Sequence, residues 1–185
     1  MKAEQTPLQD CFLIHDTIFK DERGYFFESF NEDRFNKETG SNVKFVQDNQ
    51  SHSVKGVLRG LHFQTGDFTQ AKLVRVLEGE VLDVAVDLRK DSPSFGQHFS
   101  VRLSGTSQTQ LFLPRGFGHG FVVLSDVAVF FYKCDNYYNK ASEGGIIYND
   151  TTLNIDWVLG QEELIVSSKD VALPAFGTMD YTFDC

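Results

Sequence analysis

The stretch KLVRVLEGEVLDVAVD at residues 72–87 decides the fold class. It contains two short apolar runs, at 72–77 and 81–87, on either side of the polar triplet Glu78-Gly79-Glu80. Both runs are rich in valine, a β-branched residue that favours strands, and a glycine between acidic residues is a turn signal. The stretch therefore predicts two antiparallel strands joined by a tight turn.

Further runs of this kind occur before and after the hairpin. They lie at residues 42–47, 97–103, 110–113, 121–124 and 127–132. Polar turn signals such as Asp91-Ser92-Pro93 and Ser125-Asp126 separate them. Closely spaced strands with short polar turns predict an antiparallel sandwich or barrel. Strands and helices do not alternate, which argues against a doubly wound nucleotide fold.

One helix signal precedes most of these strands. Ser29 and Glu32 have capping-box spacing, Phe35 would face inward, and Gly40 is a natural stop. The last 40 or so residues are less periodic and predict short helices that pack against the β-structure. Since no repeat or linker composition interrupts the chain, we expect residues 1–185 to form a single domain.

Composition excludes several classes of protein. The 185 residues include 18 Phe, 6 Tyr and 1 Trp, an aromatic content that excludes a disordered chain. The formal net charge of −9 argues against a non-specific nucleic-acid binder, which is normally basic. No apolar run approaches the ~18 residues of a membrane span, so no membrane segment is predicted. No apolar leader follows Met1, so we expect no secretory signal.

The cysteines are few and unpatterned. Cys11, Cys134 and Cys185 are odd in number and match no disulfide framework or zinc-site spacing. Reduced thiols in a cytoplasm are the simplest interpretation.

The segment GVLRGLHFQ at 56–64 carries two candidate functional residues, Arg59 and His62. In a regular strand their side chains would face opposite sides of the sheet, but a bulge at Gly60 would place both on the same side. Histidine titrates near neutrality and is the usual general base. The alternative is a core histidine whose ring nitrogens are hydrogen-bonded and which has no catalytic role.

Other polar residues each allow two interpretations. Lys72 begins an apolar strand, where it could stabilise an enolate or merely extend to water. Arg23 beside Gly24 could present its guanidinium to phosphate or sit in a solvated turn. Tyr132 could donate a proton or pack at a rim, and Asp83 could orient a histidine or close a turn.

The segment PRGFGH at 114–119 has the Pro-x-Gly-x-x-His form of the second cupin motif. Cupins usually pair it with an earlier His-x-His and a glutamate that complete a metal site. Here the earlier segment LHFQ at 61–64 has one histidine and no such glutamate. Open metal sites need about three protein ligands, so we expect a barrel without metal.

Several segments occur together in one order along the chain. They are DERGYFFESF (21–30), FVQDNQS (45–51), GVLRGLHFQ (56–64), KLVRVLEGEVLDVAVDLRKDSPSFG (72–96), LPRGFGHGFVVLS (113–125), YKCDNYY (132–138) and NDTTLNIDW (149–157). In this order they closely resemble the dTDP-4-dehydrorhamnose 3,5-epimerase family over nearly the whole chain. The resemblance implies a mainly β, cupin-like antiparallel β-barrel (jelly roll) with a few short helices, a homodimer, and an isomerase that needs no cofactor.

The resemblance also implies a reaction and the residues that perform it. The substrate would be dTDP-4-dehydro-6-deoxy-D-glucose, inverted at C3 and C5 through an enolate to give dTDP-4-dehydro-L-rhamnose. His62 would be the general base and Asp170 its carboxylate partner. Lys72 would hold the C4 oxygen, and Tyr132 would return a proton from the opposite face.

A further set of residues would contact the substrate, some of them across the dimer. By resemblance these are Phe19, Arg23, Glu28, Gln47, Asn49, Arg59, Asp83, His119, Tyr138 and Glu143. Arg23 and Arg59 would hold the diphosphate.

Three other functions compete with the double epimerase. A relative that inverts only C3 or only C5 of another dTDP-deoxysugar would carry the same base, lysine and tyrosine. A non-catalytic sugar-nucleotide-binding cupin is disfavoured because His62, Lys72 and Tyr132 are all present. A metal-dependent cupin oxygenase is disfavoured by the missing ligands.

Overall fold

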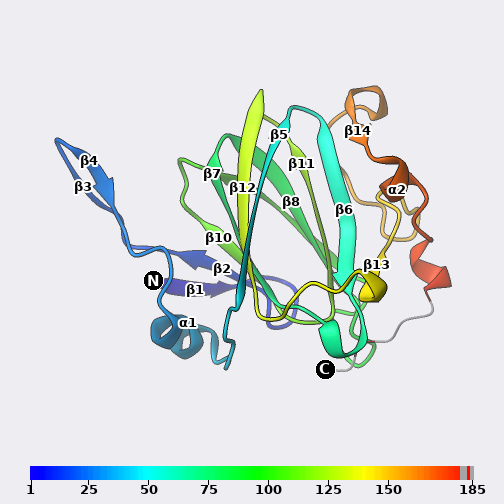
Figure 1. Cartoon of the computed structure of the whole chain (residues 1–185), viewed down its shortest axis with the longest axis horizontal. Helices are drawn as coiled ribbons and strands as arrows, with labels where there is room; N and C mark the ends of the chain where they lie inside the picture. Colours follow the sequence, from blue (N-terminus) through cyan, green and yellow to red (C-terminus); the bar gives the residue numbers. More distant parts are fainter. Residues whose placement is uncertain (180–182, 184–185) are drawn as a thin grey trace.

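The computed structural model describes residues 1–179 and residue 183. Two β-sheets stack face to face (Figure 1). The first sheet has the strand order β1 (Lys2–Gln5), β2 (Phe12–His15), β10 (Gln110–Leu113), β7 (Lys72–Glu78), β12 (Val127–Cys134), β5 (Gln47–Val54). The second has the order β13 (Glu143–Gly145), β6 (Val57–Gln64), β11 (Phe117–Val123), β8 (Glu80–Asp87), β9 (His98–Ser104), with β14 (Ile165–Val166) beside β6.

The remaining elements are short. A two-stranded hairpin, β3 (Phe19–Asp21) and β4 (Gly24–Phe26), projects away from both sheets (Figure 1). The helices are α1 (Glu32–Thr39) and α2 (Ser168–Val171), and the 3-10 turns are η1 (Gly66–Phe68), η2 (Lys140–Ser142), η3 (Gln161–Glu163) and η4 (Phe176–Thr178). In the part of the chain that is described, no helix is long and apolar enough to cross a membrane.

The predicted mainly β, jelly-roll fold is confirmed. Strand pairing within the two sheets is antiparallel, apart from the parallel contact of β14 with β6. In the residues described here the two sheets remain separate hydrogen-bonded units, so the barrel is an open sandwich rather than a closed cylinder.

The core has two main layers. Between the sheets, side chains such as Val74, Val81, Phe121 and Phe130 pack into one buried cluster. The outer face of the second sheet is covered by the chain after β13, whose Trp157 is among the side chains that pack there. The prediction that the last 40 or so residues hold short helices packed on the β-structure is therefore confirmed for the described part (Figure 1).

The two strands predicted from residues 72–87 form as β7 and β8, but they do not pair with each other as a hairpin. Strand β7 pairs with β10 and β12 in the first sheet, and β8 pairs with β11 and β9 in the second. The other strand predictions agree within a few residues, except that β11 begins at Phe117, four positions earlier than expected. The prediction of a strand at 42–47 is wrong, because β5 begins only at Gln47. The Asn36 side chain accepts a hydrogen bond from the N–H of Val43 and donates one to its C=O. The backbone around Val43 is therefore bound to α1 and not to a sheet.

The predicted helix is confirmed, but its first turn is set differently. Asn31, not Ser29, is the N-cap and accepts the N–H of Arg34. This choice places Phe30 before the cap and Phe35 in the fourth helical position, where their rings pack 5.8 Å apart as a hydrophobic staple. Gly40 ends the helix in the left-handed conformation, as predicted.

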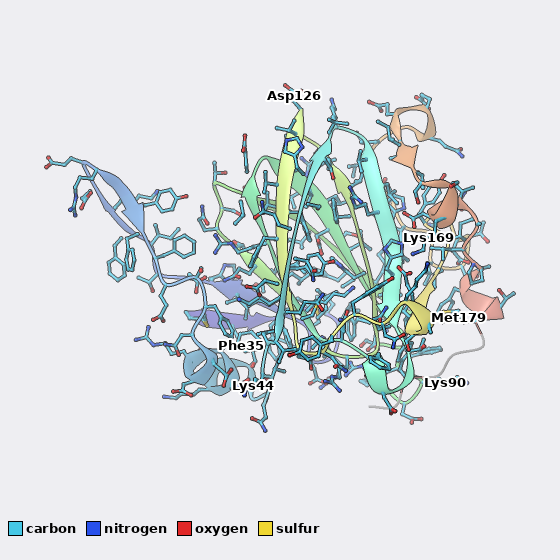
Figure 2. The ribbon with its side chains drawn as sticks, in the orientation of Figure 1. Phe35, Lys44, Lys90, Asp126, Lys169 and Met179 are labelled. Carbon is cyan, nitrogen blue, oxygen red and sulfur yellow. The ribbon has the colours of Figure 1, made fainter. Side chains whose placement is uncertain are left out.

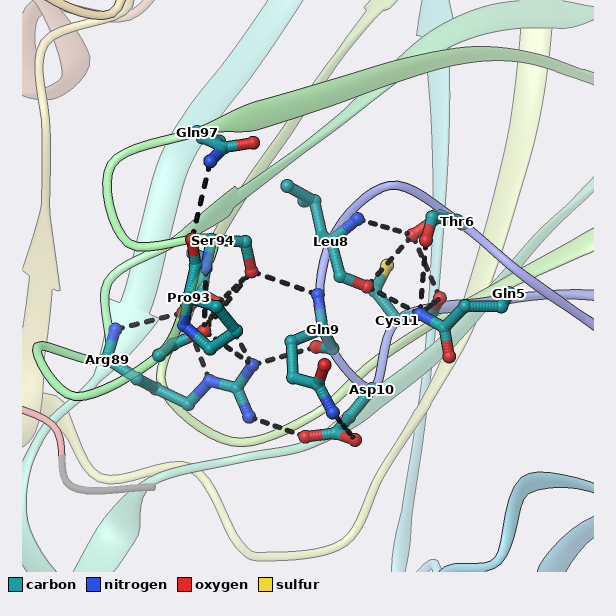
Figure 3. A network of polar contacts seen from close by, with 12 residues as sticks. Gln5, Thr6, Leu8, Gln9, Asp10, Cys11, Arg89, Pro93, Ser94 and Gln97 are labelled. Atoms are coloured by element: carbon teal, nitrogen blue, oxygen red, sulfur yellow. Dashed lines mark hydrogen bonds and ion pairs between the residues drawn. The ribbon is translucent and has the colours of Figure 1, made fainter.

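The side chain of Arg89 links the N-terminal loop to the second sheet (Figure 3). The guanidinium of Arg89 donates to Asp87 at the end of β8, and also to Asp10 and the carbonyl of Gln9. Ser92 and Ser94 donate to the same Asp87 carboxylate. Arg89 thus joins the buried carboxylate of Asp87 to the N-terminal loop, and the N–H of Gln9 adds a bond to Ser94.

Two of the three cysteines, Cys11 and Cys134, are buried free thiols. Burial raises the pKa of Cys11 to about 12 and that of Cys134 to about 11. Cys185 lies outside the described residues.

Candidate active site

A cavity of about 1050 Å³ lies between the sheets. Its lining comes from β5, β7 and β12 of the first sheet, from β6 and β11 of the second, and from the α2 segment. This volume is at the upper end of the usual range for ligand sites, about 300–1000 Å³. A nucleotide-sized ligand therefore has room here.

A β-bulge turns Arg59 and His62 toward this cavity, as predicted from Gly60. On β6 three residue steps separate Arg59 from His62, whereas their partners Phe121 and His119 on β11 are two steps apart. Gly60 has φ +123°, and a Cβ there would lie 2.5 Å from the Cα of Gly120. Only glycine fits this position without strain.

His62 is paired with Asp170 from the far end of the chain. The two side chains meet at 2.6 Å between Nε2 and Oδ1. Asp170 lies in α2, where its backbone N–H bonds the N-cap Ser167. Burial alone would raise the pKa of Asp170, but the hydrogen bond and charge of His62 outweigh it and lower that pKa. Because the carboxylate occupies Nε2, the other ring nitrogen of His62 remains available.

A second histidine–carboxylate pair stands next to the first. His119 faces His62 across β11 and β6, and its Nε2 lies 3.0 Å from Asp83 on β8. His119 lines the cavity, whereas Asp83 is fully buried behind it. Asp83 thus orients His119 and does not itself reach the cavity, although it was expected among the substrate contacts.

Lys72 and Tyr132 lie on the opposite wall, on β7 and β12 of the first sheet. Burial lowers the pKa of Lys72, and the negative charge of Asp83 opposes that change. Among the described residues, the side chain of Lys72 has no hydrogen-bond or ion-pair partner. Burial raises the pKa of Tyr132 to about 12, so its phenol keeps its proton at neutral pH.

The inward face of β5 is polar along its length. Gln47 donates to Asn49, and Asn49 donates to the buried sulfur of Cys134. Arg59, across the cavity, donates to Ser53 on the same face of β5. The predicted residues Gln47, Asn49 and Arg59 therefore share the cavity.

Three charged or phenolic side chains form a bridge at the cavity rim. The Tyr138 hydroxyl donates to Glu143 Oε2 at 3.2 Å, and Lys169 Nζ pairs with the other oxygen of the same carboxylate. Lys169 lies on the β6 side of the sandwich (Figure 2), next to Asp170 in the chain. The bridge connects the loop after β12 with β13 and α2.

Phe19, Arg23 and Glu28 do not reach the cavity of their own chain. Phe19 and Arg23 lie on the projecting hairpin, where Arg23 pairs with Asp21 and its side chain is 85% exposed (Figure 1). Glu28 pairs with Arg34 of α1. Within one chain, these residues and the cavity are separate.

Lys169 and Tyr137 line the cavity but were not predicted. Lys169 lies in a part of the sequence without hydrophobic periodicity. Its position next to Asp170 in the chain was the one feature that could have indicated a place at the cavity. Ser53, which accepts from Arg59, was also missed, because residues 47–53 are all polar and no hydrophobic alternation marks one face of this strand.

In the described ranges, no three His, Cys, Asp or Glu side chains are grouped so as to hold a metal ion. His62 and His119 each direct a ring nitrogen to their own carboxylate. The expectation of a site without metal or cofactor remains a prediction.

Comparison with known proteins gives a consistent result. Residues 5–178 match the family model described as dTDP-4-dehydrorhamnose 3,5-epimerase. The dTDP-4-dehydrorhamnose 3,5-epimerase of Salmonella typhimurium is 51% identical over 92% of this chain and 92% of its own.

Solved structures agree with the sequence comparison. The crystal structure of dTDP-4-dehydrorhamnose 3,5-epimerase from Elizabethkingia anophelis superposes with a TM-score of 0.95, at 55% identity, over 98% of this chain and 99% of that one. The dTDP-6-deoxy-D-glucose-3,5-epimerase of Legionella pneumophila, solved with dTDP-4-keto-L-rhamnose, gives a TM-score of 0.94 at 46% identity, over 100% and 99% of the two chains.

Proposed function

The chain belongs to the dTDP-4-dehydrorhamnose 3,5-epimerase family and is a sugar-nucleotide epimerase, and we propose that its cavity inverts C3 and C5 of dTDP-4-dehydro-6-deoxy-D-glucose. The product is dTDP-4-dehydro-L-rhamnose. The observation that carries the proposal is the placement of His62 with Asp170 on one wall and of Lys72 with Tyr132 on the other.

The first half of each inversion removes a proton. The C4 ketone acidifies the hydrogens at C3 and C5, and the free nitrogen of His62 accepts one of them. The Asp170 carboxylate fixes the ring and stabilises the imidazolium that results. The electron pair moves to the C4 oxygen, where the amino group of Lys72, which has no side-chain partner among the described residues, donates to the enolate oxygen and stabilises it.

The second half returns a proton from the other side. The Tyr132 phenol is protonated at neutral pH, since the ordinary pKa of tyrosine already lies well above 7 and burial raises that of Tyr132 further, to about 12. It donates to the carbon from the wall opposite His62, which inverts the centre. His62 then releases its proton and Tyr132 regains one, so one proton is removed and one added in each inversion and no redox cofactor takes part.

We further propose that the active protein is a homodimer in which the β3–β4 hairpin reaches the cavity of the second copy. Phe19, Tyr25 and Phe26 on this hairpin are large and exposed, at 62%, 59% and 71%. Arg23 on the same hairpin would meet the diphosphate together with the second copy's cavity residues. Buried free thiols at Cys11 and Cys134 suit a reducing compartment, so we place the enzyme in the cytoplasm.

The reaction in D₂O tests this function. NMR of the product formed from dTDP-4-dehydro-6-deoxy-D-glucose should show inversion and deuterium at both C3 and C5. In Tyr132→Phe, exchange of hydrogen for deuterium should outrun net inversion, because the enolate forms but its proton returns from the His62 side. Deuterium at one carbon alone would indicate a single-centre epimerase, and none at either carbon would rule out the enolate mechanism.

A further inference from the structure

Arg59 enters the cavity with a single side-chain partner. Its Nε and Nη2 both donate to the hydroxyl oxygen of Ser53, at 3.4 and 3.2 Å. Among the described residues it has no carboxylate partner. The guanidinium of a cavity arginine is therefore left without a counter-ion and oriented by one neutral oxygen.

Ser53 is well placed to hold that orientation. It is 4% exposed and lies on β5 opposite Ala128 of β12, on the inward face of the first sheet. Arg59 comes from β6 of the second sheet, immediately before the bulge at Gly60. The contact thus joins the two sheets at the edge of the cavity, through a serine that is itself buried.

The geometry also decides which end of the guanidinium is free. A guanidinium has five N–H donors in one plane. Ser53 occupies the Nε–Nη2 edge, so the end of the guanidinium, where one N–H of Nη1 and the second N–H of Nη2 run parallel, remains for a ligand. Two parallel N–H groups on such an end suit phosphate oxygens, and a long arginine side chain loses less freedom on binding if its plane is already fixed.

We propose that Ser53 is a positioning residue that orients the Arg59 guanidinium toward the diphosphate of the bound nucleotide. The inference rests on the proposed function, in which Arg59 holds that diphosphate. Ser53 itself does not touch the ligand; it acts through Arg59.

The test compares Ser53→Ala with Ser53→Thr, which retains the hydroxyl. Binding of inorganic pyrophosphate and of dTDP is measured by calorimetry, alongside steady-state kinetics. Ser53→Ala should weaken both affinities and raise KM about 5–20-fold, part of the ~10–150-fold expected for losing a charged hydrogen bond outright. The kcat should remain within about threefold, because uniform binding contributes to KM and not to kcat. Ser53→Thr should restore most of the affinity.

A matched control separates orientation from general damage. Ser100→Ala removes the same hydroxyl from β9, outside the cavity lining, and should leave affinity and KM unchanged. Thermal unfolding of the Ser53 and Ser100 variants is measured in parallel. Unchanged affinity in Ser53→Ala, or equal losses in the Ala and Thr variants, would overturn the inference.

A double-mutant cycle asks whether Ser53 acts through Arg59. In the Arg59→Ala background, Ser53→Ala should cause no further loss of pyrophosphate affinity. If the two losses of affinity are fully additive, Ser53 acts independently of Arg59. That result would overturn this inference but leave the proposed function intact. If Arg59→Ala by itself leaves pyrophosphate affinity intact, the diphosphate role of Arg59 fails and the inference fails with it.

Discussion

His62 and Asp170 are 108 positions apart in the chain, yet their side chains meet at 2.6 Å. The bulge at Gly60 turns the histidine inward, and the cap at Ser167 begins the short helix that carries the aspartate. The backbone N–H of Gly60 also bonds Asp170, so the bulge and the helix hold each other in place.

His62→Asn tests the base. Turnover should fall by about 10²–10⁴, the usual contribution of general acid–base catalysis. The affinity for dTDP should change by no more than a few-fold, because His62 acts on a sugar hydrogen. Steady-state kinetics and calorimetry measure the two quantities. Asp170→Asn should show a smaller loss of turnover in the same direction; near-normal turnover in His62→Asn would refute the assignment.

Acid should destabilise the folded chain through carboxylates such as Asp170, Asp87 and Glu143. The pKa of each is lower in the folded protein than its ordinary value. The unfolded chain therefore binds more protons in acid, and the free energy of unfolding should fall as pH drops from about 5 toward 2. Urea titrations at several pH values measure it.

Asp170→Asn supplies the comparison for this pH dependence. The variant lacks one lowered pKa, so its stability difference from the parent should shrink as the pH falls. A difference that grows in acid would contradict the sign assigned to Asp170.

Arg89→Met tests the buried ion pair between Arg89 and Asp87. The substitution leaves the fully buried Asp87 without its cation, and the free energy of unfolding should fall by about 3–5 kcal/mol. Arg102→Met is the matched control, since its pair with Glu80 is exposed and should contribute less than about 1 kcal/mol. Equal effects in the two variants, measured by urea unfolding, would show that burial of the pair is irrelevant.

Gly60→Ala tests the bulge. The added Cβ would lie 2.5 Å from the Cα of Gly120 and 2.7 Å from the carbonyl oxygen of His119. Gly24 has a similar φ of +128° but open space around it, so Gly24→Ala isolates the backbone strain. Gly60→Ala should be less stable than this control by about 1–3 kcal/mol, the usual penalty of overpacking. Equal stability of the two alanine variants in denaturant titrations would disprove the close approach.

Mixed dimers test whether the hairpin serves the second copy. A chain with His62→Asn and a chain with Arg23→Ala should each be weakly active alone. Co-expressed, they should recover about half the parent activity, because an isologous dimer has two equivalent sites and one of them then has both native residues. Activity of the purified mixed dimer measures this. Absence of recovery would place Arg23 in its own subunit's site or outside any site.

Local sequence determined much of the fold. The apolar runs on either side of Gly79, the stop at Gly40 and the bulge at Gly60 all follow from side-chain periodicity or glycine's conformational range, which act over a few residues. The strand at 42–47 was predicted from the same kind of local pattern, but the observed strand β5 begins only at Gln47. Its residues 47–53 are polar on both faces, so no hydrophobic alternation marks them, and only pairing with β12 makes them a strand.

The sequence by itself also identified a base, a cation and an acid as candidates: His62, Lys72 and Tyr132. The family resemblance added Asp170 as the partner of His62, and the structure brings the two side chains together. Tertiary structure alone decided that the three candidates face one another across a cavity, that Lys169 joins the rim, and that Arg23 stands apart from its own site. The physical reason is range. Backbone preference is set by near neighbours in the chain, whereas a catalytic site depends on which strands of two sheets face each other, and that is fixed only when the whole core packs.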